Sequence, residues 1–163
     1  MNRDIIPLLQ RVPIFAGLSD EVVSAFAETG RQERVDAEAV IVQQGTPGHE
    51  MFIVVEGEVE VVKRFLSSKQ ATLATLAIGE FFGEMCIIQC VPRSATVRAL
   101  KPSLLFVLTN GDILRLFRNC PEQFGILILN ISRDLCRRLQ RLHELLDEHG
   151  LETKDFYQRG GTI

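Results

Sequence analysis

The sequence predicts an α+β fold, in which an antiparallel β jelly-roll barrel lies between an N-terminal helical segment and long C-terminal helices. Two observations predict it. Between residues 33 and 110, short runs rich in Val, Ile, Thr and Phe are separated by Gly, Pro or Ser, a spacing typical of antiparallel barrels. From residue 111 the strand-like runs stop and a helical period follows. A chain of 163 residues has the length of one domain with a helical appendage.

Residues 1–32 form the predicted N-terminal helical segment. Its clearest helix begins in the stretch GLSDE, where Ser19 can cap the first turn. Asp20 and Glu21 favour the positive end of that helix, and VVSAFAE continues it with helical periodicity.

Residues 33–110 form the predicted barrel core. Its clearest hairpin is MFIVVEGEVEVV, where Gly57 supplies the turn. Glu58 and Glu60 alternate with Val59 and Val61, which predicts that one face of this strand is exposed to solvent. The strand-like runs, in order, are AVIV, MFIVV, EVEVV, ATLATL, SATVRAL and LLFVL.

Residues 111–149 are predicted to be helical, with Pro121 separating a short helix from a long one, and residues 150–163 form a tail. A stripe of leucines at spacings of four, three and four runs along one side of the long helix. The stripe fits either a helix laid on its own barrel or the seam of a homodimer, and its length favours the seam. Its members are Leu135, Leu139, Leu142 and Leu146.

The other faces of the long helix are charged. Arg137, Arg138 and Arg141 are expected to form a hydrated face compensated by Glu144 and Glu148.

Composition excludes several classes of protein. A net charge of −3 and a pI of about 5.7 argue against a nucleic-acid partner, which requires a basic excess. No apolar run approaches the roughly 20 residues of a membrane helix, so no membrane association is expected. The four cysteines lack C-x-x-C spacing and are typical of reduced thiols in a cytoplasmic protein.

The stretch GEFFGEMCIIQCVPRSATV, residues 79–97, carries the candidate chemistry. Gly83 allows close approach to the backbone where EMCII begins a helical turn, and Arg93 adds a planar fork that can bind two phosphate oxygens. Glu84 would repel a phosphate unless a donor such as a sugar hydroxyl lies between them. A phosphate that carries a ribose hydroxyl describes a nucleotide.

This stretch resembles the phosphate-binding cassette of cyclic-nucleotide-binding domains, the family of bacterial catabolite activators, kinase regulatory subunits and cyclic-nucleotide-gated channels. The family pattern appears here as FGEMCII followed by RSAT, and the resemblance extends over about residues 10–140. The resemblance implies a regulatory domain that binds cAMP or cGMP, without catalysis and without a metal. Ser94, where the family often has threonine with guanine recognition, favours cAMP over cGMP as the ligand.

The resemblance also implies roles for individual residues. Glu84 would take the ribose 2′-hydroxyl and Leu76 would wall the base, while Leu142 and His143 occupy the place of the family's lid over the base. The phosphate would be held by Arg93 and its neighbours in the cassette, which are Gly83, Met85, Cys86, Ser94 and Ala95.

Activators of this family carry a DNA-binding domain after the long helix, and the residues after Leu146 are too few for one. We therefore expect the output to pass to an effector protein, which the sequence does not identify, or to a change in assembly.

Two alternatives use the same fold differently. A cupin-type metalloenzyme needs several histidines on barrel strands, and the histidines here are His49, His143 and His149. A second alternative keeps the fold but senses another effector, or none, and acts as a dimeric protein-interaction module. For Arg93 alone, the structural alternative is a pair with a strand glutamate such as Glu58.

Overall fold

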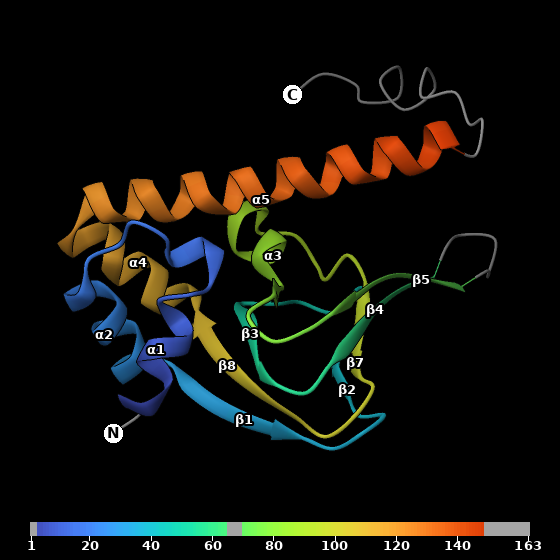
Figure 1. Ribbon diagram of the computed structural model, residues 1–163, viewed down its shortest axis with the longest axis horizontal. Helices are drawn as coiled ribbons and strands as arrows, with labels where there is room; N and C mark the ends of the chain where they lie inside the picture. Colours follow the sequence, from blue (N-terminus) through green and yellow to red (C-terminus); the bar gives the residue numbers. More distant parts are fainter. Residues whose placement is uncertain (1–2, 65–69, 149–163) are drawn as a thin grey trace.

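A computed structural model describes residues 3–64 and 70–148 as a β barrel joined to a group of helices (Figure 1). The strands form two four-stranded antiparallel sheets, in the orders β1-β8-β3-β6 and β2-β7-β4-β5, which confirms the predicted α+β jelly-roll fold. The strands are β1 (Arg31–Val35), β2 (Val40–Val42), β3 (Glu50–Glu56), β4 (Val59–Arg64), β5 (Gln70–Leu76), β6 (Phe81–Phe82), β7 (Thr96–Ala99) and β8 (Ser103–Thr109). The helices are η1 (Arg3–Ile5), α1 (Ile6–Leu9), η2 (Pro13–Phe15), α2 (Asp20–Thr29), α3 (Glu84–Gln89), α4 (Asn110–Asn119) and α5 (Pro121–Glu148).

The most apolar strands are covered on both faces. In β8, Leu105 and Val107 belong to the cluster inside the barrel, whereas Phe106 and Leu108 belong to the cluster under the helices. The two sets alternate because successive side chains of a strand point to opposite faces. Burial on both faces explains why β3 and β8 appear in the sequence as continuous apolar runs.

The N-terminal segment and α5 are fastened to each other. Ser19 caps α2 as predicted, because its side chain accepts a hydrogen bond from the amide of Val22. Asn130, buried on α5, donates from its side-chain amide to the carbonyls of Ile14 at 3.1 Å and Ala16 at 2.7 Å. These bonds satisfy a buried amide and fix the first half of α5 on the protein body.

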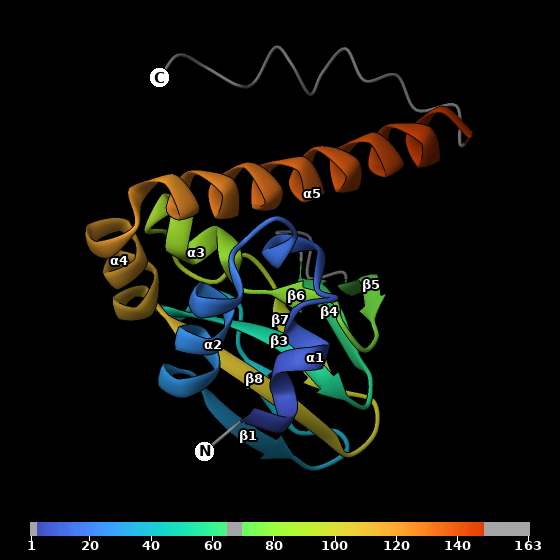
Figure 2. The same cartoon turned by 60° about the vertical axis from the view of Figure 1, so that its left-hand side comes forward.

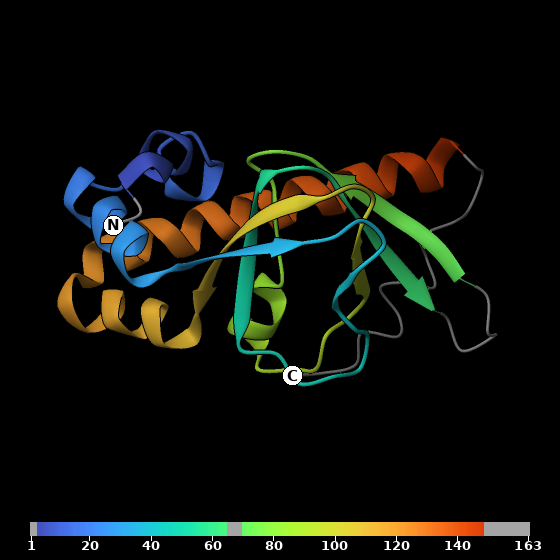
Figure 3. The same cartoon turned by 90° about the horizontal axis from the view of Figure 1, so that it is seen from below.

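α5 passes over α3 and continues well beyond it, as Figures 1 and 2 both show. Seen from below, the helices α2 and α4 gather at one end of the molecule and the strands at the other (Figure 3). The long helix therefore connects the helical end to the segment around α3.

The predicted leucine stripe is divided between two environments. Leu135 is partly buried and packs against the helical core. Leu139 and Leu142 are 46% and 42% exposed, and the side chain of Leu146 lies outside the described residues. Packing on the protein's own body therefore accounts for Leu135 but not for Leu139 and Leu142.

Two details differ from the sequence prediction. The strand β1 was not expected, and it pairs with β8 from Arg31 opposite Val107 to Val35 opposite Ser103. The outer face of β4 is not fully exposed to solvent, because Glu60 is only 7% exposed. Its carboxylate accepts hydrogen bonds from Arg98 and, at 3.2 Å, from the hydroxyl of Thr72.

Candidate ligand-binding site

The candidate site is built on the cassette, defined here as residues 82–96. Gly83 is the N-cap of α3 and has φ of +85°, a conformation that favours glycine. A Cβ at this position would lie 2.6 Å from Nη1 of Arg93 and 2.8 Å from the carbonyl oxygen of Glu50. Gly83 therefore lets the backbone turn and lets Arg93 approach it closely.

Arg93 is only 6% exposed, and its guanidinium is held by backbone carbonyls. Its Nη1 donates to the carbonyl oxygens of Glu50 at 2.7 Å and Gly83 at 3.3 Å. The guanidinium also lies 5.5 Å from the centre of the Phe52 ring.

None of the ion pairs found within residues 3–64 and 70–148 includes Arg93, and the alternative pair with Glu58 is wrong, because Glu58 pairs with Lys101 at 3.2 Å. The charge of Arg93 is therefore not neutralised by a carboxylate contact in this part of the chain. Such a buried cation is suited to bind an anion.

Glu84 begins α3 and is 3% exposed. Burial raises the pKa of its carboxyl, and the guanidinium of Arg138 offsets part of that rise. The two groups form an ion pair, with 3.5 Å between Nη1 of Arg138 and Oε1 of Glu84. The site thus holds a buried carboxylate and a buried guanidinium, Arg93, within one cassette.

Arg138 brings α5 into the candidate site. Its Nη2 donates to the carbonyl oxygen of Phe81 at 2.9 Å, and its guanidinium lies 4.7 Å from the centre of the Phe81 ring. Its Nε lies 2.6 Å from Oδ2 of Asp134, one turn earlier on the same helix. The expectation that Arg138 belongs to a hydrated face compensated by Glu144 and Glu148 is therefore wrong.

The other cassette residues lie around these two charges. Cys86 and Ala95 are buried, at 2% and 8% exposure, and Met85 is 36% exposed. The hydroxyl of Ser94 lies 3.7 Å from the sulfur of Met85.

The predicted site residues outside the cassette lie on the barrel and on α5. Leu76 is buried in the barrel cluster that also contains Phe82. Leu142 and His143 lie about one turn beyond Arg138 on α5, and Arg138 contacts Glu84 and the carbonyl of Phe81.

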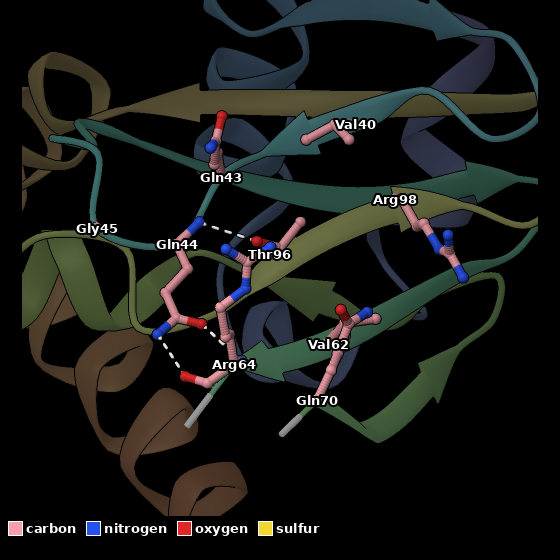
Figure 4. A pocket seen from close by; sticks show the side chains of 9 residues that line it. All are labelled: Val40, Gln43, Gln44, Gly45, Val62, Arg64, Gln70, Thr96 and Arg98. Carbon is pink, nitrogen blue, oxygen red and sulfur yellow. Dashed lines mark hydrogen bonds between the residues drawn. The ribbon is translucent and has the colours of Figure 1, made fainter. Parts of the chain in front are cut away.

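A loop behind the cassette holds it in place. The amide of Arg93 donates to the carbonyl of Thr46, and the carbonyl of Arg93 accepts from the amide of Gly45, both at 2.8 Å. The amide of Gln44 donates to the hydroxyl of Thr96 at 3.0 Å (Figure 4). These bonds join the C-terminal part of the cassette to the β2–β3 connection.

Figure 4 also shows side chains that line a cavity beside this loop, among them Val62, Arg64, Thr96 and Arg98. The volume of this cavity is about 480 Å³. Thr96 belongs to the cassette, but none of Gly83, Glu84 or Arg93 lines this cavity, so the cavity is separate from the two charged groups of the candidate site. The β4 residues that line this cavity, Val62 and Arg64, lie on the outer face of the strand.

Sequence reasoning missed two residues that shape the site. Arg138 carried no signal, because its partners Phe81 and Glu84 are more than 50 positions away in the chain. Gly48 also carried no signal in the sequence, although a Cβ there would lie 2.3 Å from Nε of Arg93. Both depend on tertiary approach rather than on a local pattern.

With this geometry in view, comparison with known proteins defines the class. The model of the cyclic nucleotide-binding domain family matches residues 32–120, and the chain belongs to this family of ligand-binding regulatory domains.

Particular relatives support the assignment. The chain is 31% identical over 135 residues to the cyclic AMP receptor protein of Thermus thermophilus, which covers 83% of this chain and 61% of that protein. It is 38% identical over 115 residues to a cyclic nucleotide-gated potassium channel of Mesorhizobium japonicum, covering 71% of this chain and 30% of the channel. A solved cyclic nucleotide-binding domain from Methylobacillus flagellatus has the same fold, with a TM-score of 0.81 at 23% identity over 91% of this chain and 84% of that one.

Two features are absent from the residues that the structure describes. None of the helices found there is long and apolar enough to cross a membrane. Residues 3–64 and 70–148 also contain no group of three or more His, Cys, Asp or Glu side chains arranged to hold a metal ion.

The raised pKa of Glu84 predicts how stability depends on pH. A carboxyl whose pKa is higher in the folded protein stabilises the fold fully below its ordinary pKa of 4.5, and this contribution is lost as the pH rises through the folded pKa. The free energy of unfolding of wild type, minus that of Glu84→Gln, should therefore fall as the pH rises from about 4.5. Urea denaturation of both proteins between pH 4.5 and 8 measures this difference, with Glu28→Gln, an exposed glutamate on α2, as control. A difference that rises with pH would contradict the burial of Glu84.

Proposed function

We propose that this domain binds a cyclic nucleotide, cAMP in preference to cGMP, on the cassette, and that it reports binding through α5 without catalysing a reaction. The observation that carries the proposal is the buried guanidinium of Arg93, held by carbonyls, beside the buried carboxylate of Glu84. The two groups match the two parts of a cyclic nucleotide that differ most in charge. The cyclic phosphodiester is an anion, and the ribose hydroxyl is a neutral donor.

Arg93 is proposed to bind the cyclic phosphodiester. Its Nη1 is engaged by Glu50 and Gly83, and this orients the planar fork so that other N–H groups can serve a ligand. Amides of the cassette between Gly83 and Cys86, with Ser94 and Ala95, are proposed to complete the phosphate contacts, as the family pattern implies.

Glu84 is proposed to accept the ribose 2′-hydroxyl. A carboxylate has two oxygens and about four acceptor positions, so it can accept from a hydroxyl while it remains paired with Arg138. The purine is proposed to lie between Leu76 on the barrel side and the region of Leu142 and His143 on α5.

The preference for cAMP rests on Ser94 after Arg93, where a threonine often accompanies guanine recognition in this family. A thermal-shift panel of cAMP, cGMP, cyclic dinucleotides and AMP tests it, because a ligand that binds the folded state raises stability in proportion to ln(1 + [L]/Kd). A larger shift with cGMP than with cAMP at equal concentration would reverse the preference. A shift with none of them would favour another effector.

The proposed signal passes through Arg138. This residue contacts Glu84 and the carbonyl of Phe81 from α5, so a ligand that engages Glu84 changes the surroundings of the helix directly. A ligand shifts a conformational equilibrium only if it contacts one state better than the other, and Arg138 supplies such a difference. α5 is proposed to close more tightly on the cassette when the nucleotide is bound.

The proposed output is a protein partner or a change in assembly. Leu139 and Leu142 leave an apolar strip exposed on α5, which supports a homodimer through this helix. All four cysteines are free, as a reducing cytoplasm would keep them, and we place the domain there.

Removal of Arg93 should abolish most of the affinity. Arg93→Leu should cost about 2–5 kcal/mol of binding free energy for cAMP, because it removes one partner of a desolvated charge pair. Isothermal titration calorimetry measures the loss, and circular dichroism checks that the β fold persists. Arg34→Leu, an exposed arginine on β1, is the matched control. Near-native affinity in a folded Arg93→Leu protein would refute the phosphate assignment.

Hydrogen exchange should reveal the coupling of the cassette to α5. In wild type, cAMP should slow amide exchange at residues 83–96 and across roughly 120–145. Arg138→Gln should keep the protection of the cassette and lose most of the protection on α5. The control is Arg137→Gln, which should behave as wild type, because the Nε of Arg137 donates to the carbonyl of Arg133 on the same helix. If ligand protects only the cassette in wild type, the domain binds without switching.

The homodimer proposal predicts the effect of charges on the apolar strip. Replacing Leu139 and Leu142 by Glu would place like charges opposite each other where the two α5 helices of the dimer meet. The double variant should therefore be a monomer. Light scattering at micromolar concentration measures the mass, with Leu114→Glu, an exposed leucine on α4, as control. A wild-type monomer under these conditions would end the proposal.

A further inference from the structure

β4 places a lysine on the side of the barrel where its other side chains are apolar. Val59 belongs to the cluster inside the barrel, and Val61 packs against that cluster. Val62 and Arg64 line the outer cavity in Figure 4. The pairing of β4 with β7 is regular from Val59 to Val62. The register shift between β4 and β5 skips Leu73 on β5, so β4 itself keeps its alternation and Lys63 follows Val61 on the inner side.

The inner side is open at this point. Lys63 pairs with Ala71 on β5, and Val61 pairs with Ala74. Both alanines are exposed, although Leu76, further along the same strand, is buried. Small, exposed side chains opposite Lys63 leave room beside the cassette for a ligand.

Lys63 reaches the cassette directly. Its Nζ donates a hydrogen bond to the backbone carbonyl of Ser94, the residue that follows Arg93. The ion pairs of the described residues do not include Lys63, so its charge, like that of Arg93, has no carboxylate contact there. Two cations therefore flank Ser94, one arriving from β4 and one from the cassette itself.

We propose that Lys63 is a second cation of the phosphate site, which contacts the ligand's phosphodiester from β4, opposite Arg93. This inference rests on the proposed function and adds a second phosphate-binding residue to it. The ammonium sits on a flexible stem with three donors, so it can turn from a carbonyl to a phosphate oxygen at little cost. A phosphodiester is the better partner, because a hydrogen bond between two charged groups is stronger than one to a neutral carbonyl.

The alternative to be excluded is that Lys63 only ties Ser94 in place. The two roles differ in whether they need charge. Lys63→Gln keeps a donor that can reach a carbonyl but removes the charge, whereas Lys63→Met removes both. A neutral methyl triester of cAMP removes the negative charge of the phosphate and adds only one methyl group to a phosphate oxygen.

The test is titration calorimetry of wild type, Lys63→Met and Lys63→Gln with cAMP and with the neutral triester. Both variants should bind cAMP roughly tenfold more weakly than wild type, the scale of a hydrogen bond to a charged group. Their affinity for the triester should match that of wild type. Lys101→Met, whose wild-type ammonium pairs with Glu58 away from the cassette, should leave both affinities unchanged.

Three outcomes would overturn the proposed role of Lys63 and leave the proposed function intact. The first is native affinity for cAMP in Lys63→Met. The second is retained affinity in Lys63→Gln with loss only in Lys63→Met, which would mean a tether. The third is equal loss for cAMP and for the triester, which would mean packing. If wild type binds no cyclic nucleotide, the proposed function fails together with it.

Discussion

The guanidinium of Arg93 lies buried where separate parts of the chain meet, and the arrangement of the cassette depends on it. It bonds the carbonyls of Glu50, at the start of β3, and of Gly83, at the start of α3. Gly48 and Gly83 lack side chains where a Cβ would collide with it. A buried cation bonded to carbonyls is costly unless an anion completes its surroundings, and the ligand's phosphate is the anion that we propose for this place.

A second charged contact connects this site to the rest of the molecule. Glu84 lies at the head of α3, and Arg138 reaches it from α5 while also bonding the backbone at Phe81. The first half of α5 is fixed by Asn130 to the carbonyls of Ile14 and Ala16. α5 is thus anchored at one end and contacted at Glu84 by Arg138, which is why we propose it as the element that responds to the ligand.

The sequence predicted most of the barrel and the cassette because their signals are local. Strands such as β3 and β8 pack on both faces, so their apolar runs are unbroken in the sequence. The turn at Gly83 and the spacing to Arg93 are features of one short stretch. β1 escaped prediction because RQERV is polar and forms a strand only through its pairing with β8.

The residues that link the site to other elements could not be found in the same way. Arg138 looked like one of several arginines on a solvated helix face until the fold placed it against Glu84. Lys63 reads as the end of a strand, and only its contact with the carbonyl of Ser94 connects it to the cassette. Such roles arise from approach between distant segments, which periodicity does not encode.

The central claim is that Glu84 and Arg93 together hold the sugar and the phosphate of one cyclic nucleotide. The most direct measurement is the affinity of cAMP and of 2′-deoxy-cAMP for wild type and for Glu84→Ala, which forms a double-mutant cycle between the carboxylate and the hydroxyl. The account predicts that loss of the 2′-hydroxyl weakens binding to wild type much more than binding to Glu84→Ala. Equal losses in the two proteins would show that the two groups do not touch, and would contradict the account.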